Sequence, residues 1–231
     1  MEFEANAGKQ LNIEVNGMQY MRIPVKTHVI VKEDVIEDVI DKYTASIRQK
    51  GDIIFVSEKI IAIMQGRSFP IDEIKPSALA RFLVKFVYKS PYGIGLGSPY
   101  TMQLAIKDVG LCRIFLGSLA AAVTKPFGVR GVFYKVCGAK AAAIDGPCDY
   151  TIPPYNRYAK MAPKNPDKVA KNVKARIGND MVVLDANDLN VEILGKSDKS
   201  LDNKFLKALF KDNPLGQSAQ QTPIAIVRMA K

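Results

Sequence analysis

The stretch Ala139-Lys-Ala-Ala-Ala-Ile-Asp-Gly-Pro-Cys-Asp-Tyr-Thr-Ile-Pro-Pro-Tyr-Asn-Arg157 is the part of the chain from which the fold prediction starts. Its small apolar side chains let neighbouring backbones approach closely, and we interpret residues 141–144 as a buried strand. The Gly146-Pro147 step ends regular structure, because glycine adopts unusual backbone angles and proline lacks an N–H donor. Asp145 is therefore expected at the end of a strand, either as an ordinary turn residue or as a functional acid beside a cleft.

A second predicted strand also ends in an acid. Residues 181–184 (Met-Val-Val-Leu) form a short apolar run, and Asp185 follows directly. Hard cations such as Mg²⁺ and Mn²⁺ bind carboxylate oxygens and complete their coordination with phosphate and water. The two aspartates, if brought together, would form such a site, with Gln217, Asn187 or Asp188 as a further oxygen donor. The alternative is that both acids are turn residues, which follow strands in many folds.

The first third of the chain predicts both strands and helices. Residues 11–15 and 20–25 alternate apolar and polar side chains, and the Asn16-Gly17 pair between them is a strong hairpin signal. Residues 33–49 place apolar side chains at helical spacing. An apolar strand at residues 51–57 is followed by a helix that runs to Met64. A second amphipathic helix is expected at residues 76–88, where Pro76-Ser77 opens it.

The rest of the chain continues this mixed pattern. We predict a strand at residues 131–136, a basic helix from Pro166 to Gly178, a strand at 191–195, a helix at 201–211 and a closing strand at 224–228. Short strands with uneven connections favour an α+β fold over a regular βαβ array. We predict mixed short-stranded sheets with flanking helices, in one domain over residues 1–231 or in two intimately joined lobes, with residues 1–19 as a candidate N-terminal extension.

Two loops are candidate ligand-binding segments. Residues 93–99 (Gly-Ile-Gly-Leu-Gly-Ser-Pro) expose successive amides and would cradle an anion or serve as a connector before a helix or strand at 101–106. Their spacing matches neither a P-loop nor a dinucleotide fingerprint. Residues 216–223 are rich in amide side chains and would contact a nucleotide or be a solvated connector. His28, the only histidine, has no Ser or Cys motif beside it, which argues against nucleophilic catalysis.

Composition narrows the class of protein. The 231 residues are 48% hydrophobic and 24% charged, as in a globular protein, and no apolar run is long enough for a membrane span. For lack of such a run, we expect no membrane as partner. The net charge of +10 is scattered, so we expect no nucleic acid as partner either, but small polyanions such as nucleotides. Three cysteines without a Cys-x-x-Cys motif, and no secretory signal at the N-terminus, predict a cytoplasmic location.

Several segments, taken in order, resemble the coenzyme F420-0:gamma-glutamyl ligase family. The resemblance is carried by Ile23-Pro-Val-Lys-Thr27 with Val29-Ile30, by residues 51–59 with Gly66-Arg67, by residues 143–145 and 182–185, and by residues 216–228. Members use GTP to add L-glutamate to a deazaflavin coenzyme. The resemblance implies the family's own α+β fold, a homodimer, and a cleft that binds GTP and two divalent cations, Mg²⁺ or Mn²⁺.

The resemblance also assigns residues by position. Asp145, Asp185 and Gln217 fall at metal-ligand positions, while no catalytic residue is assigned. The family reaction forms an acyl phosphate that the glutamate amine then attacks, and it needs charge neutralisation on the phosphate more than a protein nucleophile. The positions facing the nucleotide are Thr27, His28, Val29, Ile30, Glu58, Lys59, Leu215, Gly216, Gln217, Ser218, Gln220, Gln221 and Thr222.

Four positions depart from the family pattern. Cys148 replaces an amide side chain that serves the nucleotide, and Ala186 replaces a hydroxyl donor to the metal. Gln217 stands where the family has an acid, and Ile63 where it has a lysine. These changes leave two interpretations open. The chain is a ligase, acting on the deazaflavin or on a related carboxylate substrate, or it is a non-catalytic nucleotide- or anion-binding member of the same fold.

Overall fold

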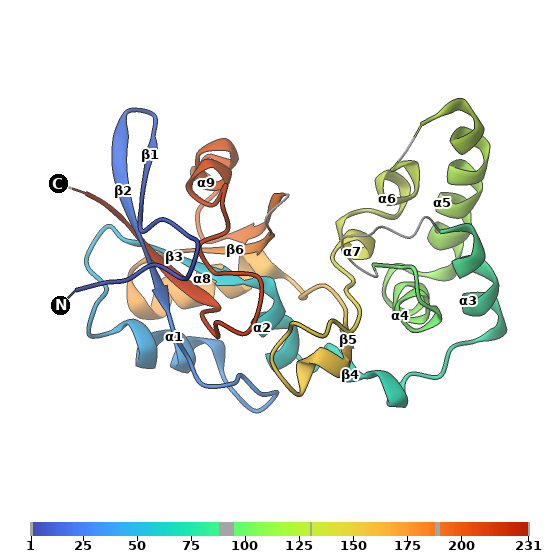
Figure 1. The fold of residues 1–231 in the computed structure, drawn as a ribbon, viewed down its shortest axis with the longest axis horizontal. Coiled ribbons are helices and arrows are strands. Elements are labelled where there is room, and N and C mark those ends of the chain that lie inside the picture. Colours follow the sequence, from blue (N-terminus) through green and yellow to red (C-terminus); the bar gives the residue numbers. More distant parts are fainter. Residues whose placement is uncertain (1, 88–94, 130, 188–189, 231) are drawn as a thin grey trace. The chain divides into compact units, whose positions relative to one another are not determined.

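The computed structural model describes residues 2–87, 95–129, 131–187 and 190–230 and divides into two compact units. The first, which we call the sheet unit, combines Met1–Gln65 with Pro163–Lys231. The second, the helical unit, is Gly66–Ala162. In Figure 1 the sheet unit carries the blue and the orange-to-red parts of the chain, and the helical unit carries the green and yellow parts.

A six-stranded mixed sheet forms the centre of the sheet unit. Its strands lie in the order β1-β2-β8-β3-β6-β7, with β3 and β6 parallel and the other pairs antiparallel. This sheet, together with the helices, confirms the predicted α+β class. The strands are β1 (Asn12–Val15), β2 (Met18–Val25), β3 (Ile53–Ser57), β6 (Asp180–Ala186), β7 (Val191–Lys196) and β8 (Ile224–Met229).

The hairpin predicted at Asn16-Gly17 is confirmed. Both residues have positive φ angles, 54° and 76°, as a two-residue turn of the mirror-image type requires. β1 and β2 pair on either side of this turn, from Val15 with Met18 to Asn12 with Met21.

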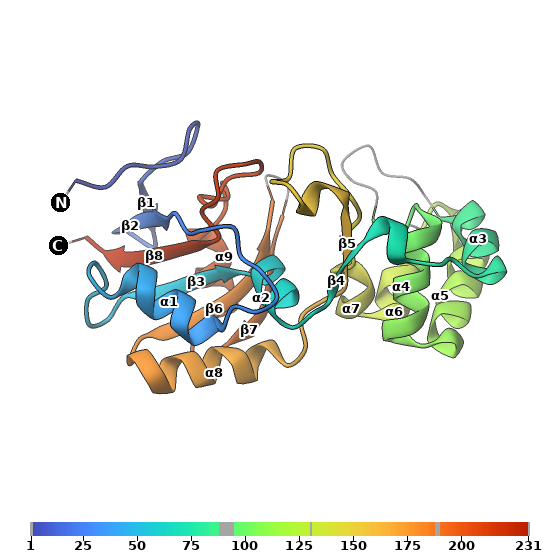
Figure 2. The same ribbon diagram turned by 90° about the horizontal axis from the view of Figure 1, so that it is seen from below.

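Helices cover both faces of the sheet. α1 (Ile36–Thr44) and α8 (Pro166–Ile177) pack on each other, and α8 packs on β6 and β7 (Figure 2). α9 (Asn203–Leu209) covers the opposite face, where Phe55 and Phe210 stack with ring centroids 4.2 Å apart. Alternation along β3 explains the two faces, because Phe55 points toward α9 while its neighbours Ile54 and Val56 point the other way. The short helix α2 (Glu58–Met64) follows β3 directly.

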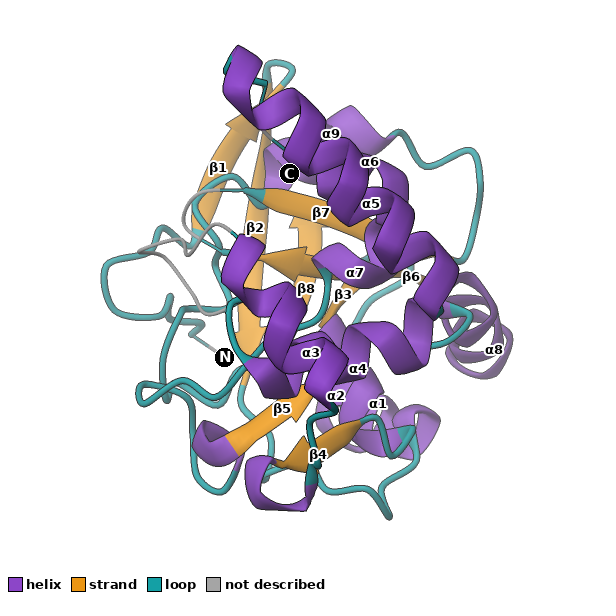
Figure 3. Ribbon diagram, turned by 90° about the vertical axis from the view of Figure 1, so that its right-hand side faces the viewer, coloured by secondary structure: helices purple, strands orange, loops and turns teal. Residues whose placement is uncertain are grey.

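The helical unit consists of short helices around its own apolar core. Figure 3 shows α3 (Ala78–Leu83), α4 (Pro99–Val109) and α5 (Leu111–Thr124) together on one side of this unit. α6 (Val132–Cys137) packs against α5, where a Cβ added to Gly117 would lie 2.5 Å from Cys137 Sγ. The unit also contains α7 (Ala139–Ala142), the two-stranded sheet of β4 (Ser68–Pro70) and β5 (Tyr158–Lys160), and 3₁₀ turns at Ile71–Glu73, Val84–Phe86, Lys125–Phe127 and Tyr155–Arg157.

Two strand predictions were wrong, and both fall in the helical unit. Residues 132–136 belong to the helix α6, residues 141–142 are the end of the helix α7, and residues 143–144 follow it. Alanine has the highest helix propensity, so a run of alanines next to Gly138 forms a helical turn more readily than a strand. Asp145 instead forms an isolated β-bridge with Lys160, with backbone N···O distances of 3.1 and 2.9 Å.

The glycine-rich segment at residues 93–99 lies partly outside the described residues. Its described end leads into α4, which confirms a helix at residues 101–106. Ser98 and Thr101 form a capping box at the start of this helix.

Buried ion pairs fasten the sheet unit together. Asp52, with a side chain 2% exposed, accepts two hydrogen bonds from Arg228 at 2.8 and 2.7 Å. Arg22 is completely buried and donates to Asp212, to Gln10 O at 2.6 Å and to Leu209 O at 3.0 Å. The surrounding groups hold the pKa of Asp212 below its usual 3.8, because the hydrogen bonds and charge of Arg22 outweigh the effect of burial.

We predict that Asp52→Asn lowers the free energy of unfolding by about 3 kcal/mol, because it leaves the Arg228 guanidinium without its charged partner. Urea denaturation measures this change. The matched control is Asp38→Asn, which breaks an exposed pair with Arg176 and should cost no more than about 0.5 kcal/mol. Equal losses of unfolding free energy in the two variants would contradict the conclusion that the Asp52–Arg228 pair stabilises the sheet unit.

Candidate functional site

One edge of the six-stranded sheet collects the ends of four chain segments. Val25, the last residue of β2, pairs with Ile224, the first residue of β8. Ile224 also pairs with Val56 of β3, and the next residue of β3, Ser57, pairs with Leu184 of β6. The segments that begin or end here are therefore residues 26–30, 58–59, 185–187 and 215–223. Every predicted site residue except Asp145 lies in these segments.

The segment before β8 is hydrogen-bonded to the segment after β2. Thr27 N–H donates to Gln221 O at 3.1 Å, and the Gln221 side-chain amide donates back to Thr27 O at 2.6 Å. Gln221 has a left-handed backbone, with φ at +60°. On the other side, Ser57 N–H donates to Pro223 O at 2.9 Å. These bonds fix the loop between two strand ends.

Residues 215–222 form a partly exposed loop with internal hydrogen bonds. Thr222 Oγ1 donates to Leu215 O at 2.8 Å, and Ser218 N–H donates to the Gln220 side chain at 2.7 Å. Asn6 donates to Pro214 O and to Thr222 Oγ1, both at 2.8 Å, so the N-terminal segment supports the loop.

His28 is held between Tyr43 and Asp34. Its Nδ1 lies 2.8 Å from the Tyr43 hydroxyl, and its Nε2 lies 2.9 Å from Asp34 Oδ2. The same Asp34 oxygen accepts the N–H of Val31 at 2.8 Å. Burial raises the pKa of Asp34, but the hydrogen bonds from Val31 and His28 and the charges of His28 and Lys42 outweigh it, so the pKa lies below 3.8. The imidazole therefore has one fixed orientation, with 38% of the side chain exposed.

The structure divides the predicted nucleotide-binding residues by their exposure. The side chains of Thr27, Ile30, Glu58, Leu215 and Thr222 are buried, each at 9% exposed or less, and so contribute to the core or to the support of the site. The remaining ones are partly or fully accessible, namely His28, Val29, Lys59, Gly216, Gln217, Ser218, Gln220 and Gln221. These residues present an imidazole, an ammonium group and four amide or hydroxyl side chains.

The predicted metal ligands are in different parts of the chain. Asp185 lies inside β6, opposite Glu192 of β7, and is half-buried. Asp145 lies in the helical unit, where its Oδ1 accepts the N–H of Gly146 at 3.0 Å. The pairing of the two aspartates therefore stays a prediction. Asn187 N–H donates to Asn190 O at 3.0 Å and Asn190 N–H donates to Asn187 Oδ1 at 2.9 Å, while Asp188 lies outside the described residues.

Within residues 2–87, 95–129, 131–187 and 190–230, no group of three or more His, Cys, Asp or Glu side chains could hold a metal ion. A site built from Asp185 and Gln217 would contain only one side chain of these types.

Asp34, Tyr43 and Asn6 were missed by the sequence analysis. Both Asp34 and Tyr43 fall within the helix that the sequence predicts at residues 33–49. A hydrogen bond from a side chain to a residue far along the chain leaves no periodic pattern, so nothing in the sequence marked them.

Tyr150, five residues after Asp145, is another polar residue of this segment. A hydrogen bond with Cys148 raises the pKa of Tyr150 to about 12, with burial and the charges of Cys148 and Asp145 acting in the same direction. Tyr150 therefore stays protonated at neutral pH and can donate a hydrogen bond.

Two comparisons with known proteins bear on this site. The family model described as F420-0:Gamma-glutamyl ligase matches residues 24–188 of the chain. No curated protein matches the chain. The matched range includes residues 26–30, 58–59, Asp145 and Asp185, and ends before the loop at 215–222. None of the helices in the described residues is long and apolar enough to cross a membrane.

We predict that Asp34→Asn makes stability less sensitive to acid. The folded-state pKa of Asp34 is depressed, so its contribution is present above the unfolded-state pKa and is lost as the pH falls through the folded-state value. Wild-type protein should therefore lose more free energy of unfolding than Asp34→Asn between about pH 5 and pH 2. Glu33→Gln, at the exposed neighbouring residue, is the control and should follow the wild-type curve.

Proposed function

The chain belongs to the F420-0:gamma-glutamyl ligase family, and we propose that it is a GTP- and divalent-cation-dependent ligase. The family match supports a gamma-glutamyl ligase activity on coenzyme F420-0. Our finer proposal is that the enzyme joins L-glutamate to the deazaflavin coenzyme or to a related carboxylate. The observation that carries it is the single sheet edge at which residues 26–30, 58–59, 185 and 215–222 meet.

The nucleotide would be bound by the accessible side chains of this edge. Lys59 would contact a phosphate through its ammonium group, and the amides of Gln217 and Gln220 would hydrogen-bond to the base or ribose. His28, oriented by Asp34 and Tyr43, would be a fixed wall of the site. Because the 215–222 loop is hydrogen-bonded to Thr27 through Gln221 and to Asn6 through Thr222, little ordering is required when the ligand binds.

Asp185 and Gln217 would hold the cation. Carboxylate and amide oxygens fit Mg²⁺ or Mn²⁺, while Zn²⁺ prefers nitrogen and sulfur donors. When bound, the cation would neutralise charge on the nucleotide phosphates. The donor set therefore fits the cation that the family resemblance implies.

The proposed reaction needs no nucleophile from the protein. A substrate carboxylate oxygen attacks the γ-phosphorus of GTP, and GDP leaves. The amine of L-glutamate then attacks the acyl carbon, an amide bond forms, phosphate leaves and the amine loses a proton. The protein's part is to position the reactants and to present positive charge and N–H donors to the phosphate.

We further propose that the protein is cytoplasmic and forms a homodimer.

We predict that GTP with Mn²⁺ raises the melting temperature and that Asp185→Asn abolishes most of this rise. Differential scanning fluorimetry measures it, and mass spectrometry should detect a deazaflavin product heavier by one glutamate residue. Asp38→Asn on α1 is the matched control and should retain the full rise. An unchanged rise in Asp185→Asn would remove Asp185 from the cation site.

A second candidate function is a non-catalytic nucleotide-binding member of the family. Ala186 and Gln217 favour it, because both replace stronger metal ligands of the family pattern. In that case the protein should bind GTP but form no product with any of a panel of carboxylates and amines. Ala186→Thr combined with Gln217→Glu should then raise the Mn²⁺ affinity about tenfold, as measured by calorimetry.

A further inference from the structure

α5 is apolar on both its inner and its outer side. Ile114 and Gly117 face the core of the helical unit and are buried. On the outer side, the side chains of Leu111, Phe115, Leu116, Leu119 and Val123 are 48–58% exposed. A helix with apolar side chains on two opposite sides is typical of a helix that is covered on both of them.

The outer residues form one continuous stripe, which we call the α5 face. At about 100° per residue, residues 111, 115, 119, 123 and 116 follow one another around less than half of the helix. Phe127, in the 3₁₀ turn after α5, extends the stripe and is 80% exposed. At roughly 100 Å² for each half-exposed side chain, the α5 face reaches about 600 Å², the upper end for a monomeric soluble protein.

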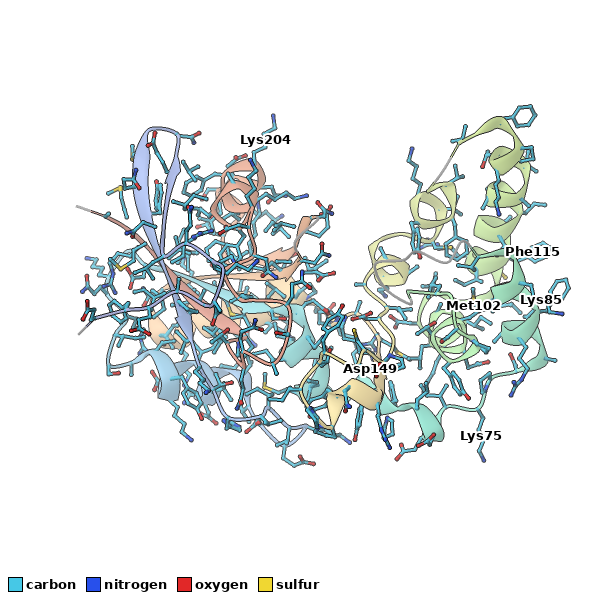
Figure 4. The ribbon with its side chains drawn as sticks, in the orientation of Figure 1. Lys75, Lys85, Met102, Phe115, Asp149 and Lys204 are labelled. Atoms are coloured by element: carbon cyan, nitrogen blue, oxygen red, sulfur yellow. The ribbon has the colours of Figure 1, made fainter. Side chains whose placement is uncertain are left out.

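Basic residues surround the α5 face. Phe115 and Lys85 point out from the same side of the helical unit (Figure 4), and Phe82 near Lys85 is another exposed aromatic, at 55%. Lys125 at the end of α5 and Arg113 on α5 are also exposed. Apolar and cationic side chains thus share one surface.

The stretch of chain that contains α5 has a large excess of basic residues. Residues 74–144 contain ten Lys and Arg but only one acid, Asp108. Asp108 is paired with Arg67 at 2.6 Å, with both side chains only 9% exposed, so it does not offset the surface charge. The cations among the described residues of this stretch are all exposed, namely Lys75, Arg81, Lys85, Lys107, Arg113, Lys125, Lys135 and Lys140.

This combination favours one kind of partner. A second copy docked through the α5 face would bring two cationic rims together, which costs binding energy. A nucleic acid would neutralise the cations but leave the Leu and Val side chains of the stripe in water. A bilayer with anionic lipids accommodates both the cations and the apolar stripe. Its headgroups pair with Lys and Arg, and its acyl boundary accepts apolar side chains.

We propose that the α5 face docks the protein on the surface of an anionic lipid bilayer, with Phe115, Leu119 and Phe127 entering the interface. The helix would lie in the plane of the membrane and would not cross it. The inference departs from our expectation of no membrane partner, which rested on the lack of a spanning segment. It does not depend on the proposed ligase activity.

The chain offers a direct reporter, because it contains no tryptophan. Phe115→Trp and Phe127→Trp should each shift their emission to the blue when vesicles containing phosphatidylglycerol are added. The matched control is Met18→Trp in the sheet unit, where Met18 is 52% exposed, and its emission should not change. Failure of both α5-face reporters to shift would overturn the proposal.

Co-sedimentation with the same vesicles measures how much the apolar and the basic side chains contribute to membrane binding. Phe115→Ser combined with Leu119→Ser should lower partitioning about tenfold, and so should Lys85→Glu combined with Lys125→Glu, while Met18→Ser should bind like wild type. Circular dichroism verifies that each variant is folded. Equal binding to pure phosphatidylcholine vesicles would contradict the charge argument. A dimer in solution that Phe115→Ser with Leu119→Ser dissociates, without loss of vesicle binding, would show that a second copy is the partner.

Discussion

The position of β8 between β2 and β3 is the constraint on which the rest of the sheet unit depends. Residues Ile224–Val227 of β8 are at most 2% exposed and pair on both sides. A slip of one residue would turn every one of their side chains to the opposite face. The register that buries them also places the end of β2, the end of β3 and the loop before β8 at one edge. The strand register that buries the core residues of β8 is therefore also the register that brings the segments of the candidate site together.

Two arginines, the buried Arg22 and the partly buried Arg228, reinforce this requirement through their ion pairs. Arg228 is on β8 itself and reaches Asp52, just before β3, while Arg22 is on β2 and reaches Asp212, in the segment that leads to β8. Each pair joins the first part of the sheet unit to its last part. The chain can therefore contain residues 66–162 between α2 and α8 without losing the continuity of the sheet.

Local patterns predicted the sheet unit better than the helical unit. The alternation of apolar and polar side chains and the Asn16-Gly17 turn predicted β1 and β2, and Pro166 and Gly178 predicted the ends of α8. These signals can be read from the sequence because each depends only on neighbouring residues. The errors at residues 131–136 and 141–144 occurred in short apolar runs, where a strand and a buried helix look alike. The sequence pointed to the segments that meet at the sheet edge, and their role as a binding site stays a prediction. The bonds from His28 to Asp34 and Tyr43 depend on tertiary contacts and could not be predicted.

The distribution of charge changes the argument for nucleotide binding. Residues 66–162 contain thirteen Lys and Arg and five Asp and Glu, a net charge of +8 out of the +10 of the chain. The sheet unit, with twenty basic and eighteen acidic residues, is nearly balanced. The excess positive charge therefore belongs mainly to the unit that carries the α5 face, and it cannot by itself support a nucleotide site at the sheet edge. The nucleotide proposal rests on placed groups such as Lys59 and the loop amides, and the net charge supports the surface interaction of the helical unit.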